Sequence, residues 1–172
     1  PLNGVLGMAE VLQGLVKTPE KQRMVATIRQ SGETLLTVLN SILDMSKIEA
    51  GKYILELQPT NLRQLLHEIN QTFTIFSENK RVTLVANIDP LIADVLLIDP
   101  LRLRQVLQNL LSNAIKFSAE GVVFFDVRIL ANDHAGQLIE FRIIDNGVGM
   151  AKEDIERALK PYEQVGSPTT TS

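Results

Sequence analysis

Asn109 and Asn113 are the two residues whose type and spacing most directly indicate chemistry in this sequence. They belong to the stretch LRLRQVLQNLLSNAIKF, residues 101–117, in which apolar residues recur at the three- and four-residue spacing of a helix. Residues four apart lie one turn above each other, so both amides are expected on one helix face. Such amides compete with the backbone for hydrogen bonds and need partners. Followed by Lys116, the pair favours a polar ligand, such as a hydrated metal ion carrying phosphates, over a merely polar edge of an amphipathic helix.

A second group of interest, Asp-Asn-Gly-Val-Gly at residues 145–149, follows the apolar run Phe-Arg-Ile-Ile. A carboxylate and glycines after a strand are often no more than a turn and its cap. Glycine also lets a backbone come close to a ligand. The order of the two groups, with one hairpin-like segment between them, resembles the N-box and G1-box of sensor histidine kinases. That family shares its ATP-binding fold with DNA gyrase.

The resemblance implies a site for ATP with Mg²⁺. Asn113 is the implied magnesium ligand, and Asn109 is implied to orient the triphosphate and a metal-bound water. An amide oxygen beside three phosphates suits magnesium, which prefers oxygen ligands and retains several waters. Asp145 is implied to accept a hydrogen bond from the exocyclic amine of adenine, which selects adenine over guanine. Gly147 and Gly149 would let the backbone pass close to the nucleotide.

Four further residues are expected near the nucleotide. Lys116 offers a point charge to phosphate, and its alternative role is that of a cation at a helix C-terminus. Phe117 would either wall the base or belong to the ordinary core. Met150 is expected to start a lid, followed by a short helix over 151–159. Tyr162 stands in a run that resembles the F-box, where the family usually has Phe, and it keeps the aromatic character.

Residues 1–50 are expected to form an antiparallel helical hairpin, because apolar residues alternate at steps of three and four on both sides of Pro19. Pro19 is placed to open the second helix and Gly51 to end it. The apolar stripe is wide enough that a second copy would bury it as a dimeric four-helix bundle. The alternative is a monomeric hairpin packed on the following domain. By resemblance, residues 1–7 are the end of an H-box, so the phosphoacceptor His lies upstream of Pro1 and no catalytic residue is assigned within the chain.

Residues 51–172 are expected to form a partial ATP-binding domain. The predicted elements are a strand at Tyr53–Gln58, a helix at 61–79 capped by Asn61, strands at 82–88 and 95–98, the helix at 101–117, and hairpin strands at 121–130 and 137–144. The helix at 61–79 should bury Leu62, Leu65, Leu66, Ile69, Phe73 and Phe76. The helix at 101–117 should bury Leu103, Val106, Leu107, Leu110, Leu111, Ala114 and Ile115. The fold class is therefore α+β: a helical hairpin followed by an α/β sandwich of the histidine kinase ATPase type. By resemblance this sandwich is truncated at the C-terminus, since the second glycine box is missing.

Composition narrows the function classes. The chain has 172 residues, 45% of them hydrophobic, a net charge of −3 and no cysteine. Without a block of Lys and Arg, we expect no nucleic-acid partner. No apolar run is long enough for a membrane span and no signal peptide is visible, so no membrane contact is expected of this stretch. The start at Pro1 without Met indicates an excised piece. His67 and His134 lack an H-box context and are interpreted as surface residues rather than phosphoacceptors or metal ligands.

The resemblance implies a sensor histidine kinase of the hybrid type. In the homodimer, the γ-phosphoryl group of ATP would pass to the bundle His and then to an Asp of a response regulator receiver domain. The fragment alone is expected to be inactive and cytoplasmic, with its parent anchored in the inner or plasma membrane. One alternative is a signalling scaffold or a phosphatase-dominant degenerate kinase acting through its bundle. Another ATPase of the same superfamily is disfavoured, because Asn109 cannot serve as the base for which those enzymes carry Glu.

Overall fold

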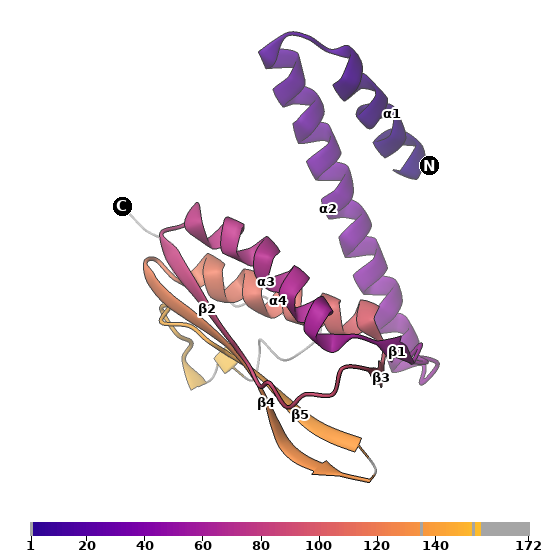
Figure 1. The fold of residues 1–172 in the computed structure, drawn as a ribbon. Coiled ribbons are helices and arrows are strands. Elements are labelled where there is room, and N and C mark those ends of the chain that lie inside the picture. Colours follow the sequence, from indigo (N-terminus) through magenta and orange to yellow (C-terminus); the bar gives the residue numbers. More distant parts are fainter. Residues whose placement is uncertain (1, 135, 153, 156–172) are drawn as a thin grey trace. The chain divides into compact units, whose positions relative to one another are not determined.

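The computed structural model describes residues 2–134, 136–152 and 154–155. The chain divides into two compact units, Pro1–Ile54 and Leu55–Ser172 (Figure 1). Each unit is built from its own elements and is described by itself below. None of the helices in the described residues is both long and apolar enough to cross a membrane.

The first unit is a helical hairpin of α1 (Leu2–Leu15) and α2 (Pro19–Glu49). Thr18 precedes α2 with an extended backbone and Pro19 opens the helix, as the sequence predicted. One close contact between the helices is made at Gly32. A Cβ placed on Gly32 would lie 2.7 Å from Cδ2 of Leu6, so this glycine lets the two helices approach.

The C-terminus of α2 is a Schellman motif centred on Gly51. The Lys52 amide donates to the Lys47 carbonyl at 2.9 Å, and the Gly51 amide donates to the Ile48 carbonyl at 3.0 Å. Gly51 has φ +63°, a left-handed conformation that glycine adopts without the steric cost of a Cβ. The predicted role of Gly51 in ending the helix is confirmed.

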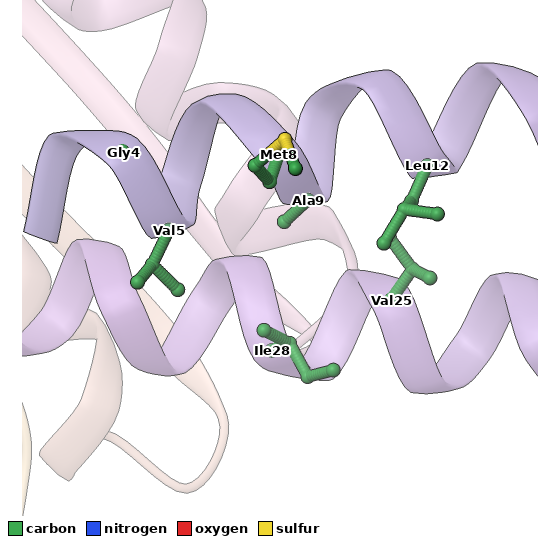
Figure 2. Close-up of a pocket in the computed structure, with 7 residues that line it drawn as sticks. All are labelled: Gly4, Val5, Met8, Ala9, Leu12, Val25 and Ile28. Atoms are coloured by element: carbon green, nitrogen blue, oxygen red, sulfur yellow. The ribbon is translucent and has the colours of Figure 1, made fainter.

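Much of the apolar surface of the hairpin is not covered by the hairpin itself. Only Ala9, Val25 and Gly32 are buried within α1 and α2. Met8 and Leu15 are each 69% exposed. An open groove between the helices is lined by Gly4, Val5, Met8, Ala9, Leu12, Val25 and Ile28 (Figure 2). Exposed apolar surface of this kind is expected of a hairpin that packs against a further helical surface.

The second unit is a two-layer arrangement of helices on a mixed sheet (Figure 1). Its elements are β1 (Gln58–Thr60), α3 (Leu62–Glu78), β2 (Val82–Ile88), β3 (Leu96–Ile98), α4 (Pro100–Phe117), β4 (Gly121–Asp133) and β5 (Gly136–Ile144). In the three-stranded sheet, β4 lies between β2 and β5, parallel to β2 and antiparallel to β5. A separate antiparallel pair is formed by β1 and β3. The predicted helical and α/β content is confirmed.

One hydrophobic core lies between the sheet and helices α3 and α4. It consists of Leu62, Leu65, Leu66, Ile69, Phe73, Val82, Ile92, Leu107, Leu111, Ala114, Ile115, Val123, Phe125 and Val127. The alternation along β4 is strict: Val123, Phe125 and Val127 are at most 1% exposed, while Phe124 between them is 41% exposed. Helix α3 begins as predicted, with the Asn61 side chain accepting a hydrogen bond from the Gln64 amide at 3.0 Å.

Three details of the prediction were wrong. The strand expected at Tyr53–Gln58 is β1 at Gln58–Thr60, because β3 offers pairing partners for only three residues. Phe76 is 41% exposed at the rim, edge-on to Phe73, and Ser77 takes the buried position. The hairpin strands continue into the expected loop, so that Asp133 pairs with Gly136, whose φ of +138° permits the tight turn. His67 and His134 are exposed, as expected.

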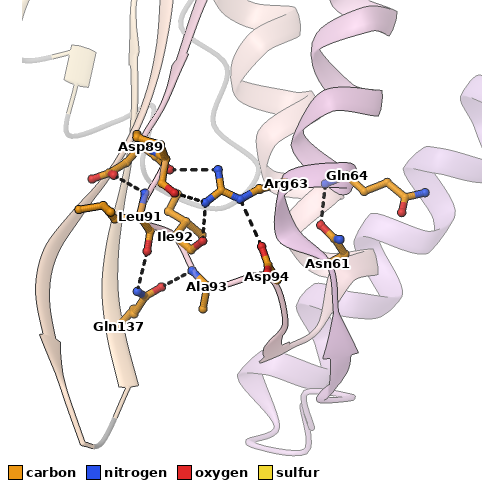
Figure 3. Close-up of polar contacts among 10 residues, drawn as sticks. Asn61, Arg63, Gln64, Asp89, Leu91, Ile92, Ala93, Asp94 and Gln137 are labelled. Atoms are coloured by element: carbon orange, nitrogen blue, oxygen red, sulfur yellow. Dashed lines mark hydrogen bonds and ion pairs between the residues drawn. The ribbon is translucent and has the colours of Figure 1, made fainter.

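The connection between β2 and β3 is fastened by two side chains (Figure 3). The guanidinium of Arg63 donates to the carbonyl of Ile92 at 2.6 Å and also to that of Pro90, and it lies 3.7 Å from the carboxylate of Asp94. Gln137 of β5 accepts from the Ala93 amide at 2.9 Å and donates to the Leu91 carbonyl at 3.1 Å. These contacts allow Ile92, 2% exposed, to enter the core from an irregular segment.

Candidate nucleotide-binding site

The N-terminus of α4 is fixed by one carboxylate that accepts two backbone hydrogen bonds. Asp99 Oδ1 accepts from the Arg102 amide at 3.0 Å, and Oδ2 accepts from the Glu56 amide at 3.0 Å. Both hydrogen bonds stabilise the charged carboxylate, and the one from Arg102 has the larger effect. They hold the pKa of the Asp99 carboxyl below its usual range. Asp99 thereby caps the helix that carries both predicted amides and ties it to the segment entering the second unit.

Helix α4 has a buried face and an outer face, and the predicted amides lie on the outer one. Leu107, Leu111, Ala114 and Ile115 are buried, whereas Asn109 and Asn113 are exposed. Two residues counted with the buried stripe were placed wrongly: Val106 is 55% and Leu110 46% exposed. They stand one helical turn apart on the same side as Asn113. The outer face of α4 thus combines amides with apolar side chains, as a surface that receives a partly apolar ligand would.

Lys116 and Phe117 end α4 and lie against each other. Lys116 Nζ is 5.0 Å from the centroid of the Phe117 ring, within the range of a cation–π contact. Phe117 is 46% exposed, so it does not belong to the buried core. Of the two alternatives for Phe117, burial in the ordinary core is therefore excluded, and its ring is available at the surface.

The Asp145 turn is folded onto the end of α4. Asp145 Oδ1 accepts a hydrogen bond from the Gly147 amide at 2.8 Å. A Cβ placed on Gly147 would lie 2.7 Å from the Phe117 carbonyl oxygen and 2.8 Å from Asp145 Oδ1. Any other residue at 147 would collide with a backbone carbonyl that cannot move independently. This contact brings together the two groups that the sequence singled out.

The remaining predicted residues follow this turn. Gly149 has φ +68°, and a Cβ built there meets no protein atom within 4 Å, so its backbone conformation by itself favours glycine. Met150 is 60% exposed. A helical turn starts at Ala151, whose carbonyl accepts from the amides of Asp154 and Ile155. The rest of the helix expected over 151–159, and Tyr162, lie outside the described residues.

Comparison with known proteins finds one matching family model within each unit. The family model for the His Kinase A (phospho-acceptor) domain matches residues 1–51. The model for the histidine kinase-, DNA gyrase B- and HSP90-like ATPase matches residues 98–172. The chain belongs to the sensor histidine kinases. The predicted family is confirmed.

Two named relatives and two solved structures illustrate the relationship. The autoinducer 2 sensor kinase/phosphatase LuxQ of Vibrio cholerae is 35% identical over 99% of this chain, and sensor protein GacS of Pseudomonas syringae is 39% identical over 95%. The matched regions are 20% and 18% of those proteins, so the chain spans about a fifth of their length. Full-length ShkA, solved in complex with AMPPNP, is 31% identical with a TM-score of 0.69 over 89% of this chain and 32% of ShkA. Acinetobacter baumannii AdeS, at 18% identity, has a TM-score of 0.61 over 89% of this chain and 74% of AdeS, and shares the fold.

Two polar features of this histidine kinase domain were missed by sequence reasoning. Arg104 of α4 contacts Glu68 of α3 at 2.6 Å, and the Arg104 hydrogen bond, followed by one from Gln64, lowers the pKa of the Glu68 carboxyl. Asn146 donates from Nδ2 to the Glu120 carbonyl at 3.1 Å. Each joins residues far apart in the sequence, so only the fold brings them together. Nothing in the sequence itself indicated that the opposite charges of Glu68 and Arg104 would pair.

Ser118, directly after α4, is 5% exposed and its hydroxyl has no hydrogen-bond partner among the described residues. Ser77 is 1% exposed, but its hydroxyl donates to the Thr74 carbonyl at 2.9 Å. Because an unpaired buried hydroxyl is costly, Ser118→Ala should leave the free energy of unfolding unchanged or raise it. Ser77→Ala should lower it by about 1 kcal/mol. Urea unfolding of the two variants makes the comparison, and a loss in Ser118→Ala as large as that in Ser77→Ala would contradict it.

Proposed function

We propose that this chain supplies the dimerisation and ATP-binding parts of a histidine kinase of the hybrid type. The complete protein would transfer the γ-phosphoryl group of ATP to a histidine of the helical bundle and then to an aspartate of a receiver domain. The observation that carries this proposal is the packing of Gly147 on the Phe117 carbonyl. It places the Asp145 turn beside the helix of Asn109 and Asn113.

The outer face of α4 fits the phosphate end of ATP with Mg²⁺. Asn113 would offer its amide oxygen to the ion, and Asn109 would orient the triphosphate. Both amides are exposed and free of side-chain hydrogen bonds among the described residues, so neither is committed to the fold. Lys116, in the last turn, would add positive charge near phosphate. Bound Mg²⁺ supplies neutralisation of the phosphate charge during phosphoryl transfer.

The Asp145 turn fits the adenine end. One carboxylate oxygen is engaged by the Gly147 amide, which leaves Oδ2 as the acceptor for the exocyclic amine of adenine. Phe117, with its exposed ring, would wall the base, and Met150 would begin the cover over it. ATP and a receiver domain are both met in the cytoplasm, and we place this part of the protein there.

The helical hairpin supports dimerisation. Its groove and the exposed apolar side chains of α1 and α2 form a surface that a second copy would bury in a four-helix bundle. A surface of this kind on an isolated hairpin promotes association in water. The two exposed histidines, His67 and His134, belong to the second unit, and neither is proposed as the phosphoacceptor.

The test is calorimetric titration of the chain with a non-hydrolysable ATP analogue, with and without Mg²⁺, beside Asp145→Asn. In Asp145→Asn one carboxylate oxygen is replaced by an NH2 group, which cannot accept a hydrogen bond, so with the remaining oxygen engaged by the Gly147 amide a donor would face the adenine amine. Loss of one charge-assisted hydrogen bond should weaken binding by about 10- to 100-fold. Removing Mg²⁺ should also weaken binding. Equal affinity in wild type and Asp145→Asn would contradict the adenine assignment, and absence of binding to the wild-type chain would favour a scaffold that signals through its helices.

A further inference from the structure

Asn146 lies between Asp145 and Gly147, but its side chain takes part in a different contact from the one that Gly147 makes with Phe117. Its Nδ2 donates to the Glu120 carbonyl at 3.1 Å, in the short connection between α4 and β4. The same amide lies close to Gly121, where a built Cβ would come within 2.1 Å of Nδ2. Gly121 has φ +124°, so glycine is required there by both conformation and contact. The position occupied by the Asn146 amide exists because residue 121 has no side chain.

The Asp145 turn is therefore attached to the end of α4 at two points. At the first, Gly147 rests on the Phe117 carbonyl. At the second, Asn146 is hydrogen-bonded to Glu120. Asp145 itself is exposed, so burial does not fix its carboxylate. The second attachment resists rotation of the turn about the first, and a rotation would carry the Asp145 carboxylate away from its place relative to α4.

We propose that Asn146 is a positioning residue for adenine recognition, which acts by holding the Asp145 carboxylate at a fixed place relative to Asn109 and Asn113. This inference rests on the proposed function and extends it. In this role Asn146 would not itself contact the nucleotide, because its amide nitrogen is hydrogen-bonded to the Glu120 carbonyl. The ligand feature it serves is the exocyclic amine of the base, because that is the group Asp145 would recognise. Such positioning matters because a recognition group that is slightly misplaced loses most of its binding energy for the ligand.

The first experiment compares two nucleotides on wild type and Asn146→Ala. ATP carries the exocyclic amine, and purine riboside triphosphate lacks it. Asn146→Ala should weaken ATP binding by about tenfold, the equivalent of one hydrogen bond, and change the affinity for purine riboside triphosphate by less than about twofold. A general loss of structure would weaken both nucleotides alike. Equal losses would therefore overturn the proposal.

A double-mutant cycle with Asp145→Asn tests whether the effect passes through the carboxylate. If Asn146 acts only through Asp145, Asn146→Ala should cause no further loss of ATP affinity in the Asp145→Asn background. Additive losses would overturn the proposal. Failure of the wild-type chain to bind ATP refutes the proposed function and the inference with it. Binding by wild type with unchanged ATP affinity in Asn146→Ala refutes the inference alone.

A matched pair of glycine variants perturbs the same contact from its other side. Gly121→Ala places a methyl group where the Asn146 amide lies and should reproduce the selective loss of ATP affinity. Gly136→Ala carries the same kind of backbone strain, since φ is +138°, but has no atom within 4 Å of the added Cβ. Gly136→Ala should keep the wild-type ratio of the two affinities. A ratio shifted equally by both variants would contradict a role for the Asn146 contact.

Discussion

Gly147→Ala should weaken ATP binding by roughly 10- to 100-fold, which makes it the most damaging single-methyl change in the candidate site. The added Cβ would lie 2.7 Å from the Phe117 carbonyl oxygen, and that oxygen belongs to the backbone at the end of α4. The turn must move away from the helix, and the Asp145 carboxylate moves with it. Calorimetric titration with the ATP analogue in the presence of Mg²⁺ measures the loss.

Gly149→Ala is the control for this prediction. Its Cβ would meet no atom within 4 Å, but its φ of +68° makes alanine strained. This variant should cost roughly 1 kcal/mol of stability and leave the Asp145 turn on α4. ATP affinities that fall equally in the two variants would contradict a specific effect of the contact with Phe117.

Phe125→Ala should lower the free energy of unfolding of the second unit by about 3–5 kcal/mol. Phe125 is fully buried in the middle of β4, at the centre of the core under α3 and α4. Removing its ring leaves a cavity that the neighbouring strands and helices cannot fill. Urea unfolding followed through the NMR signals of the β4 amides reports on the second unit and gives the loss.

Phe124→Ala supplies the comparison, because the adjacent ring points to the opposite face of the sheet and is 41% exposed. It pairs with Ile144 of β5 and Val85 of β2 on that face. Its loss should be about 1 kcal/mol, the scale of a cross-strand pair. If Phe124→Ala proved as destabilising as Phe125→Ala, the outer face of the sheet would have to be covered in solution.

Local pattern was enough to predict most elements of this chain. Asn61 as a cap, Gly51 as a helix end and the whole of β2 follow from interactions within a few residues, and the structure has them as predicted. Errors arose where a second element decides the outcome. Tyr53 was assigned to a strand although β3 is too short to pair with it. Val106 has the helical spacing of a buried residue, but it lies outside the face of α4 that packs on the sheet and is exposed.

The candidate site divides in the same way. The residue types at Asn109, Asn113 and Asp145 could be singled out because their motifs are local and ordered along the chain. The need for glycine at position 147 could not be predicted, because the atom that excludes a side chain there belongs to Phe117. Asn146 was passed over because nothing within its own turn indicates that its amide reaches Glu120. Both contacts join the turn after β5 to the end of α4 and the start of β4, and they can be recognised only once the pairing of these strands is known.

The parallel pairing of β2 with β4 has a consequence for how the domain refolds. Parallel neighbours need a crossover, and α4 lies within the one that links these strands. The antiparallel β4–β5 hairpin is local and can form within about 10 μs, whereas the crossover must wait for α4 to dock. Until then the β4 edge that will receive β2 is open to strands of other chains. Refolding yield, more than native stability, should therefore depend on how readily α4 forms a helix.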